Sequence, residues 1–198
     1  MNTIKRYVLA LAVLGGVSTS LYAQNTASVS SVHATAKIIN PLGLQKLTPL
    51  SFGTLIRPPS GTGTAVMSPS QIAPSLSTVT GGVATTMQGA IDPSTGHFYG
   101  PGPATFYAYG EDGFTFDVVL PSTVLMINRM GGSDHLNVHD FTTDHPGPNV
   151  LTKLLPTDQY GVFNFAVGAT VDVPAAPISG TYYTGWYDGD FTVSVVYH

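Results

Sequence analysis

The chain has 198 residues, no Cys and a formal net charge of −4, and only 9% of its residues are charged. The acidic balance excludes a basic face for nucleic acid or anionic lipid, and the lack of Cys excludes disulfides and thiolate metal sites. Hydrophobic residues make up 43% of the chain, more than disordered segments usually carry, so we expect one folded domain with its own core.

The N-terminus has the three-part pattern of a secretory signal peptide. Two basic residues precede an apolar stretch over residues 7–17, and a small polar run ends at Ala23. The apolar stretch is shorter than the roughly 20 residues of a membrane-spanning helix. We therefore expect residues 1–23 to be removed on export. The mature chain, for which we expect no membrane-spanning segment, would pass through the periplasm to the cell surface or an extracellular fibre.

Segments in which apolar and polar residues alternate recur along the mature chain, and each is bounded by Gly, Pro, Asn or Asp. A period of two predicts β-strands with one buried face. In chain order, the expected strands cover residues 32–38, 50–55, 64–68, 75–80, 104–110, 114–120, 124–127, 136–141, 161–173 and 191–197. No mature segment keeps the apolar spacing of a helix for ten residues, so no helix is predicted.

Short strands at this spacing, separated by turns, are typical of an immunoglobulin-like β-sandwich. We expect a single all-β domain over residues 32–198, preceded by an N-terminal extension of residues 24–31. Residues 111–113 predict a turn, because Gly accepts the positive φ that tight turns demand. Two long loops, residues 57–63 and 91–103, interrupt the strands without separating domains.

One cluster of potential metal ligands lies within residues 134–145. Its candidate ligands are Asp134, His135, His139 and His145. On an extended strand, His135 and His139 would face the same side but lie about 13 Å apart at roughly 3.3 Å per residue. Ligands of one Zn²⁺ or Cu²⁺ must converge on a point, which would need a tight loop here. We therefore expect polar residues on a solvated strand and turn, and no metal site.

The motifs of common catalytic sites are not found in the sequence. No Gly-x-Ser-x-Gly elbow is present, and the adjacent acids Glu111 and Asp112 belong to a turn rather than to two facing strands. Neither Gly-rich loop precedes a helix that could bind a phosphate. We expect no enzyme activity, no catalytic residue and no cofactor.

Aromatic residues gather near the C-terminus, over residues 182–190. Tyr183, Trp186 and Tyr187 lie there beside Asp188 and Asp190. Exposed Tyr and Trp beside Asp would suit a carbohydrate or a protein partner, because they offer rigid apolar area with a polar tip. The alternative, which we favour, is a twisted hairpin whose aromatic side chains cover one end of the domain.

Several motifs follow one another along essentially the whole mature chain. They are ATA over residues 34–36 with Pro41-Leu42, LSFGT over 50–54, YGEDGFTFDVVLP over 109–121, FAVGATVDVP over 165–174, GTY over 180–182 and FTVSVVY over 191–197. In these motifs and their order, the chain resembles an exported bacterial family known only as domain of unknown function 4402. That family is similar in character to spore-coat-U and chaperone–usher pilin subunits. Residues 91–103 and 183–190 are longer than its pattern.

The resemblance implies a pilin-like sandwich that lacks one strand, with a hydrophobic groove beside an unpaired edge. A periplasmic chaperone first, and then the N-terminal extension of the next subunit at an outer-membrane usher, would add the missing strand. The strand used in assembly would carry Phe191, Val193, Val195 and Tyr197 on one face. The implied function is that of a structural subunit of a surface fibre or pilus, whose partners are copies of itself or related subunits.

The donor strand would lie in the N-terminal extension, where Ala27 and Val29 alternate with polar residues and Val32 follows. This segment is short and poor in large apolar side chains, so it would fill a groove badly. An alternative therefore stays open: an exported adhesin or lectin-like module with a complete sandwich, which binds through the region of Trp186.

Overall fold

The computed structural model describes residues 33–80, 84–85, 89–131, 134–176 and 184–198. The chain forms two compact units, Met1–Lys37 and Ile38–His198, and all of the described strands lie in the second. In the first unit, residues 33–37 are exposed and have no regular secondary structure. None of the described residues belongs to a helix long and apolar enough to cross a membrane.

The N-terminal expectations have different outcomes. The signal peptide and the donor residues Ala27, Val29 and Val32 lie outside the described residues. The first expected strand is wrong, because residues 33–42 form no strand and the side chain of Ile38 is 94% exposed. The alternating side chains there include two Ala, which bury little apolar area, so local alternation alone does not hold this segment in a sheet.

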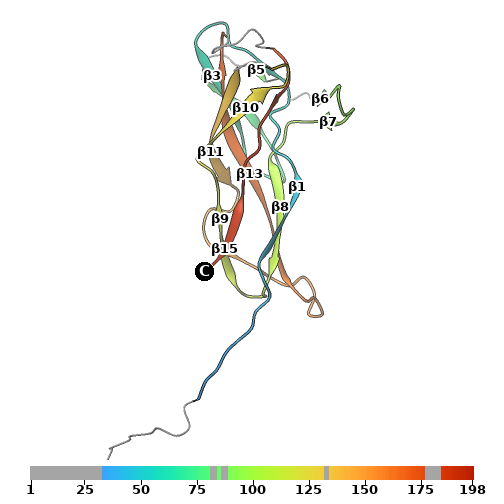
Figure 1. Cartoon of the computed structure of the whole chain (residues 1–198), viewed down its shortest axis with the longest axis vertical. Helices are drawn as coiled ribbons and strands as arrows, with labels where there is room; N and C mark the ends of the chain where they lie inside the picture. Colours follow the sequence, from blue (N-terminus) through green and yellow to red (C-terminus); the bar gives the residue numbers. More distant parts are fainter. Residues whose placement is uncertain (1–32, 81–83, 86–88, 132–133, 177–183) are drawn as a thin grey trace, which may run out of the picture. The chain divides into compact units, whose positions relative to one another are not determined.

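The second unit is all-β and contains two larger sheets and two small strand pairs (Figure 1). The first sheet has the order β1 (Gly43–Thr48), β8 (Ala104–Gly110), β13 (Gly161–Pro174), β11 (His135–Thr143), β10 (Thr123–Asn128) and β14 (Tyr187–Asp188), with β3 (Thr62–Met67) on β13 and β4 (Leu76–Thr80) on β3. The second sheet has the order β12 (Asn149–Val150), β9 (Thr115–Val119) and β15 (Ser194–Tyr197). The small pairs are β2 (Leu55–Ile56) with β5 (Ala84–Thr85), and β6 (Ala90–Ile91) with β7 (Phe98–Tyr99).

The 14-residue strand β13 is the centre of the first sheet. Along one edge it pairs first with β8, over Gly161–Val167, and then with β3, over Ala169–Pro174, while β11 pairs with the opposite edge. Gly168 lies between the part of β13 that pairs with β8 and the part that pairs with β3. A Cβ at this position would lie 2.1 Å from the carbonyl oxygen of Met67, so only Gly permits this close approach.

Two clusters of buried apolar side chains fill the unit. The first joins both sheets and consists of Ala104, Phe106, Ala108, Phe116, Leu151, Phe165 and Val167. The second consists of Phe52, Ala65, Met67, Leu76, Leu136, Val138, Ala169, Val171 and Val173. Among the described residues, the second cluster contains none from β9, β12 or β15. The second sheet therefore covers only part of the first, and other segments border the remaining face.

The turn predicted over residues 111–113 is present, with the backbone N–H of Phe114 donating to the carbonyl of Glu111 and Gly113 at a φ of 77°. It does not join two paired strands, however. The strand before it, β8, lies in the first sheet and the strand after it, β9, lies in the second. The turn therefore carries the chain from one sheet to the other.

Candidate functional site

An apolar groove of about 960 Å³ lies against the part of the first sheet that the second sheet leaves uncovered. Its floor is the inward face of β10, β11 and β13, and the floor residues are Val124, Met126, Leu136, Val138, Phe141, Val171 and Val173. Two segments border it, residues 49–57 and residues 184–191. Because alternate residues of a strand face the same side, the sequence pattern of these strands produces a continuous apolar floor.

One wall of the groove is the C-terminal segment, which runs antiparallel to β9 and β10. Tyr197 pairs with Phe116 and Ser194 with Val119 at one end, and Asp188 pairs with Ile127 at the other. Between these pairs, the five residues 189–193 of the C-terminal segment lie beside the seven residues 120–126, so the register of pairing shifts. At the shift, a Cβ on Gly189 would lie 2.6 Å from the carbonyl oxygen of Leu125, so the wall approaches β10 closely there.

This wall is also an edge. In the part of the chain that the structure describes, no strand pairs with the other side of β14 or β15. Phe191, Val193, Val195 and Tyr197 are half-buried and pack against the cluster that joins the two sheets. The four residues predicted to form one face therefore do share a face, and of these four Phe191 also lines the groove.

Tyr197 also fixes the point at which the chain enters the domain. Its hydroxyl donates to the carbonyl of Asn40 at 3.1 Å and accepts from the backbone N–H of Glu111 at 2.7 Å. A carboxylate oxygen of Glu111 in turn accepts hydrogen bonds from the backbone N–H and the side-chain amide of Asn40. No local sequence pattern predicts this anchor, because its three residues lie far apart along the chain.

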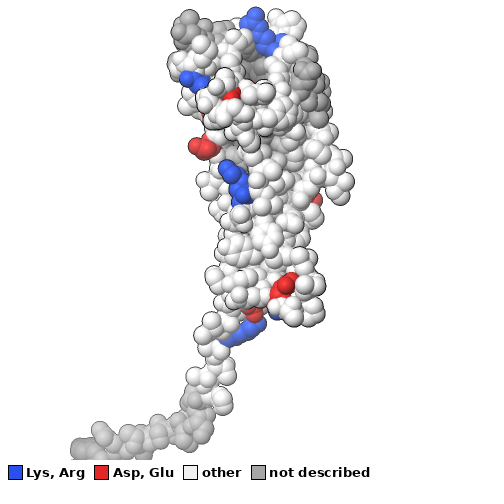
Figure 2. Space-filling view, turned by 90° about the vertical axis from the view of Figure 1, so that its right-hand side faces the viewer, with Lys and Arg blue, Asp and Glu red and all other residues white. Residues whose placement is uncertain are grey.

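The opposite wall, residues 49–57, is attached elsewhere in the unit. Ser51 forms an isolated bridge with Gly102, with N···O distances of 2.9 and 2.8 Å, and β2 pairs with β5. Phe52 is buried in the second cluster. Both walls are thus attached to other parts of the unit, the C-terminal wall to β10 and residues 49–57 to Gly102 and β5. Uncharged side chains cover most of the face seen in Figure 2.

Arg129 joins three elements at one end of the groove. Its guanidinium donates two hydrogen bonds to the carboxylate of Asp188 on β14, and a third, at 2.6 Å, to Asp92 after β6. It also lies 5.4 Å from the ring centroid of Trp186, whose carbonyl accepts from the Arg129 backbone N–H. We call these four residues the Arg129 clasp. No local sequence pattern predicts the clasp, because Arg129 lies 37 residues from Asp92 and 59 from Asp188.

The ionisation of the clasp is fixed by its hydrogen bonds. Hydrogen bonds from Ser94 and then Arg129 hold the pKa of the Asp92 carboxyl well below its usual range, although burial opposes this. Asp188 and Asp92 raise the pKa of Arg129 further above its usual value. These hydrogen bonds therefore favour the charged forms of Asp92 and Arg129.

The aromatic residues predicted as a ligand or partner surface lie at the same place. Trp186 and Tyr187 are half-buried and line the groove, and Trp186 meets Tyr99 edge to face at 6.3 Å between ring centroids. Tyr183 lies outside the described residues. The two described rings therefore belong to the wall of the groove.

The structure shows where the four candidate metal ligands lie. Asp134 is buried, His135 and His139 lie on β11, and His145 is 3.0 Å from its neighbour Asp144. Among the residues that the structure describes, no three His, Cys, Asp or Glu side chains come together as a metal site requires. The four candidates are close together in the sequence but do not form such a group in the structure.

His139 is held between two carboxylates. Its Nδ1 is 3.0 Å from an oxygen of Asp140 and its Nε2 is 3.2 Å from an oxygen of Asp172. Burial lowers the pKa of His139, but the hydrogen bonds and charges of Asp172 and Asp140 outweigh it and raise the pKa above 6.5. The protonated imidazole is therefore more stable in the folded state.

This arrangement predicts a pH dependence of stability. The contribution of protonated His139 is complete below its unfolded pKa of about 6.5 and disappears as the pH rises through the higher folded pKa. We expect wild type to lose about 0.2–1 kcal/mol relative to His139→Gln between pH 5.5 and 8.5, because the pair is partly exposed. Urea unfolding of both proteins measures this. A wild type that gains stability relative to the variant over that range would contradict it.

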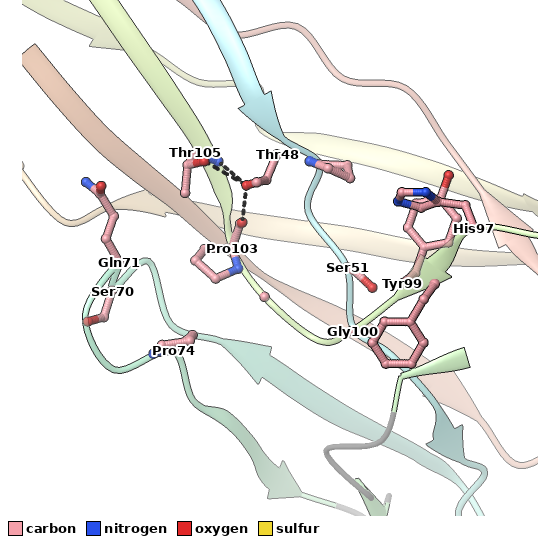
Figure 3. Close-up of a pocket in the computed structure, with 13 residues that line it drawn as sticks. Thr48, Ser51, Ser70, Gln71, Pro74, His97, Tyr99, Gly100, Pro103 and Thr105 are labelled. Carbon is pink, nitrogen blue, oxygen red and sulfur yellow. Dashed lines mark hydrogen bonds between the residues drawn. The ribbon is translucent and has the colours of Figure 1, made fainter. Parts of the chain in front are cut away.

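A second, smaller cavity of about 320 Å³ opens on another side of residues 49–51. Figure 3 shows His97 and Tyr99 on one side of it and Ser70, Gln71 and Pro74 on the other. None of the described residues that line it is an acid, a Lys or an Arg. It is an uncharged cavity with aromatic rings at one side.

Comparisons with known proteins give one result. The model of the family "Domain of unknown function (DUF4402)" matches residues 42–197, which include every described strand. No curated protein and no solved structure matches the chain.

Proposed function

The chain belongs to the DUF4402 family of domains of unknown function, and we propose that it is a structural subunit of a bacterial surface fibre or pilus that assembles by β-strand complementation. The observation that carries this proposal is the apolar groove beside the edge formed by the C-terminal segment. On this proposal the domain is a pilin-like sandwich that lacks one strand. It has no catalytic role.

The groove has both features that strand addition requires. An added strand needs a backbone edge with which to pair and an apolar surface for its alternate side chains. Tyr187 and Asp188 of the C-terminal wall supply a short edge, and the floor supplies the apolar surface. From Leu136 to Phe141 the floor spans about 17 Å at roughly 3.4 Å per residue, which suits an added strand of about five to eight residues. Alternate residues of that strand would be apolar.

The N-terminal segment of another copy, or of a related subunit, is the proposed donor. Residues 33–38 are exposed and belong to no described strand, so we include them in the candidate donor. That lengthens the candidate donor from residues 24–31 to residues 24–38. The longer segment adds Ala34, Ala36 and Ile38 at alternate positions.

Export is part of the proposal. The expected signal peptide would direct the chain to the periplasm, where a chaperone would occupy the groove and an outer-membrane usher would exchange it for the donor strand. The edge and apolar floor explain the need for such a partner, because an exposed strand edge invites unwanted pairing.

Deleting residues 24–38 should stop chain growth without unfolding the domain. The donor strand is lost, while every strand of the domain begins after residue 42. Size-exclusion chromatography and negative-stain microscopy of the full chain and of the deletion, with the chaperone co-expressed, would measure growth, and urea unfolding would measure stability. Fibres of equal length from both chains would contradict the proposal.

A second candidate function, an exported adhesin or lectin-like module, is favoured by the cavity of Figure 3. Phe98 is 61% exposed at its edge, beside Tyr99 and His97. Exposed rings in an uncharged cavity suit the apolar face of a neutral sugar. A glycan array with wild type and Phe98→Ala would test this. Binding that Phe98→Ala abolishes would support the module, and the absence of any glycan bound by wild type would exclude it.

A further inference from the structure

The C-terminal wall of the groove has little backbone pairing near Trp186. Besides the hydrogen bond from the Arg129 backbone N–H to the Trp186 carbonyl, Tyr187 and Asp188 alone among the described residues of this wall pair with β10, and residues 189–193 form no strand before β15 begins. Thr184, Gly185 and residues 188–190 are exposed. A two-residue pairing is marginal in water, so this wall needs another anchor if the groove is to keep its shape while empty.

Arg129 supplies that anchor. A guanidinium that donates two hydrogen bonds to one carboxylate is fixed in orientation as well as in distance, and charged partners make these hydrogen bonds stronger than neutral ones. The same side chain reaches Asp92, whose side chain is fully buried. Asp92 is itself held by the backbone N–H and hydroxyl of Ser94, at 2.8 and 2.7 Å. The wall is thus tied to a buried carboxylate in the β6–β7 hairpin.

All parts joined by the clasp line the groove. Ile91 and Tyr99 of the hairpin, Arg129 itself, and Trp186 and Asp188 of the wall contribute to its surface. The position of Arg129 therefore sets the separation between the hairpin and the C-terminal wall. If the wall moved away from β10 at this point, the edge that pairs with an added strand would move with it.

We propose that Arg129 is a positioning residue that holds the C-terminal wall of the groove in its strand-accepting place before a strand enters. This inference rests on the proposed function, because it takes the groove as the acceptor. The clasp makes the empty groove a formed site rather than one that the added strand must assemble. Formation in advance reduces the ordering that binding requires and so increases affinity.

The clasp can be observed directly, because Trp186 is the single Trp of the chain. In the full chain, Arg129→Gln should shift the Trp186 fluorescence maximum to longer wavelength. It should also speed amide hydrogen exchange in residues 184–191 at least tenfold, while β13 keeps its protection. Arg129→Lys keeps the charge but not the planar guanidinium. Its fluorescence maximum and exchange rates should therefore lie between those of wild type and Arg129→Gln. The matched control is Lys46→Gln on β1, which removes one positive charge elsewhere and should change neither signal.

If Arg129→Gln has the same Trp186 fluorescence maximum and the same exchange rates in residues 184–191 as wild type, the inference is overturned. If Arg129→Gln also loses protection in β13, the whole domain has unfolded, and Asp92→Asn then decides. It keeps Arg129 and its bonds to Asp188 but weakens the tie to the hairpin, so the same local changes with β13 intact support the clasp. Unchanged signals in Asp92→Asn would overturn it.

A peptide-binding experiment distinguishes failure of this inference from failure of the proposed function. The probe is a synthetic peptide of residues 24–38. If wild type binds the peptide and Arg129→Gln binds it at least tenfold more weakly, the clasp positions the acceptor. Equal binding by both would overturn that role. A wild type that binds no peptide and forms no fibre would count against the proposed function, whereas fluorescence and exchange would still show whether Arg129 holds the wall.

Discussion

Replacing Met126 with Glu is expected to reduce strand capture by the groove at least a hundredfold while leaving the domain folded. Met126 is half-buried on the floor of the groove, so water reaches a carboxylate there as long as the groove is empty. An added strand would cover that carboxylate with apolar side chains. Burying an unpaired charge costs several kcal/mol, and each 1.4 kcal/mol is a tenfold loss of affinity.

The neighbouring residue provides a matched control for this prediction. Leu125 lies on the same strand but faces away from the groove and is 53% exposed. Leu125→Glu introduces the same charge one position away and should assemble as wild type does. Size-exclusion chromatography and microscopy would measure assembly, and urea unfolding would show that both variants fold. Normal assembly of Met126→Glu, or equal defects in both variants, would contradict the account.

Phe165→Ala is expected to destabilise the domain by about 3–5 kcal/mol, the usual cost of removing a buried aromatic ring. Phe165 has no exposed surface, lies at the centre of the cluster that joins the two sheets, and stacks on Phe106 with 5.2 Å between ring centroids. Its removal leaves a cavity in this cluster, and the pairing of Phe165 with Phe106 on β8 limits how far the strand can move to fill it.

Urea unfolding of Phe165→Ala measures this loss, and Phe98→Ala is the control. Phe98 is 61% exposed, so its removal should change the free energy of unfolding by less than about 1 kcal/mol. A loss below 1 kcal/mol in Phe165→Ala would mean that this cluster is not the core that holds the sheets together.

The strands that sequence alternation predicted well are β8, β9 and β13, each of which has a partner strand on both sides. Residues 104–110 coincide with β8, and residues 114–120 and 161–173 agree with β9 and β13 to within a residue at each end. In these strands the alternate side chains enter the core, so the local pattern and the tertiary packing agree. The family resemblance is confirmed by the match over residues 42–197.

Alternation of apolar and polar residues predicted strands wrongly where the alternate side chains are not buried. Residues 33–38 alternate but form no strand, while Gly43–Thr48 forms β1 without clear alternation, since most of its residues are exposed and its pairing with β8 holds it. The loop expected over residues 91–103 contains most of the β6–β7 hairpin. These elements depend on distant partners, which a local pattern does not contain.

Local spacing predicted one feature of the candidate site, the shared face of the C-terminal segment. The resemblance implied a groove beside the C-terminal strand, and Phe191, Val193, Val195 and Tyr197 face the core together as their spacing required. The Arg129 clasp could not be predicted, because its charged residues are isolated in the sequence and only the fold brings them together.

A photoreactive amino acid in place of Thr54 tests the central claim most directly. Thr54 is exposed on the groove wall opposite the C-terminal segment. In the cells that make the protein, we predict that this position cross-links to the N-terminal segment of another copy or of a related subunit. Met126→Glu should abolish the cross-link, and the same group at Leu125 should not form it. Cross-links confined to the same chain, or identical at both positions, would contradict the account.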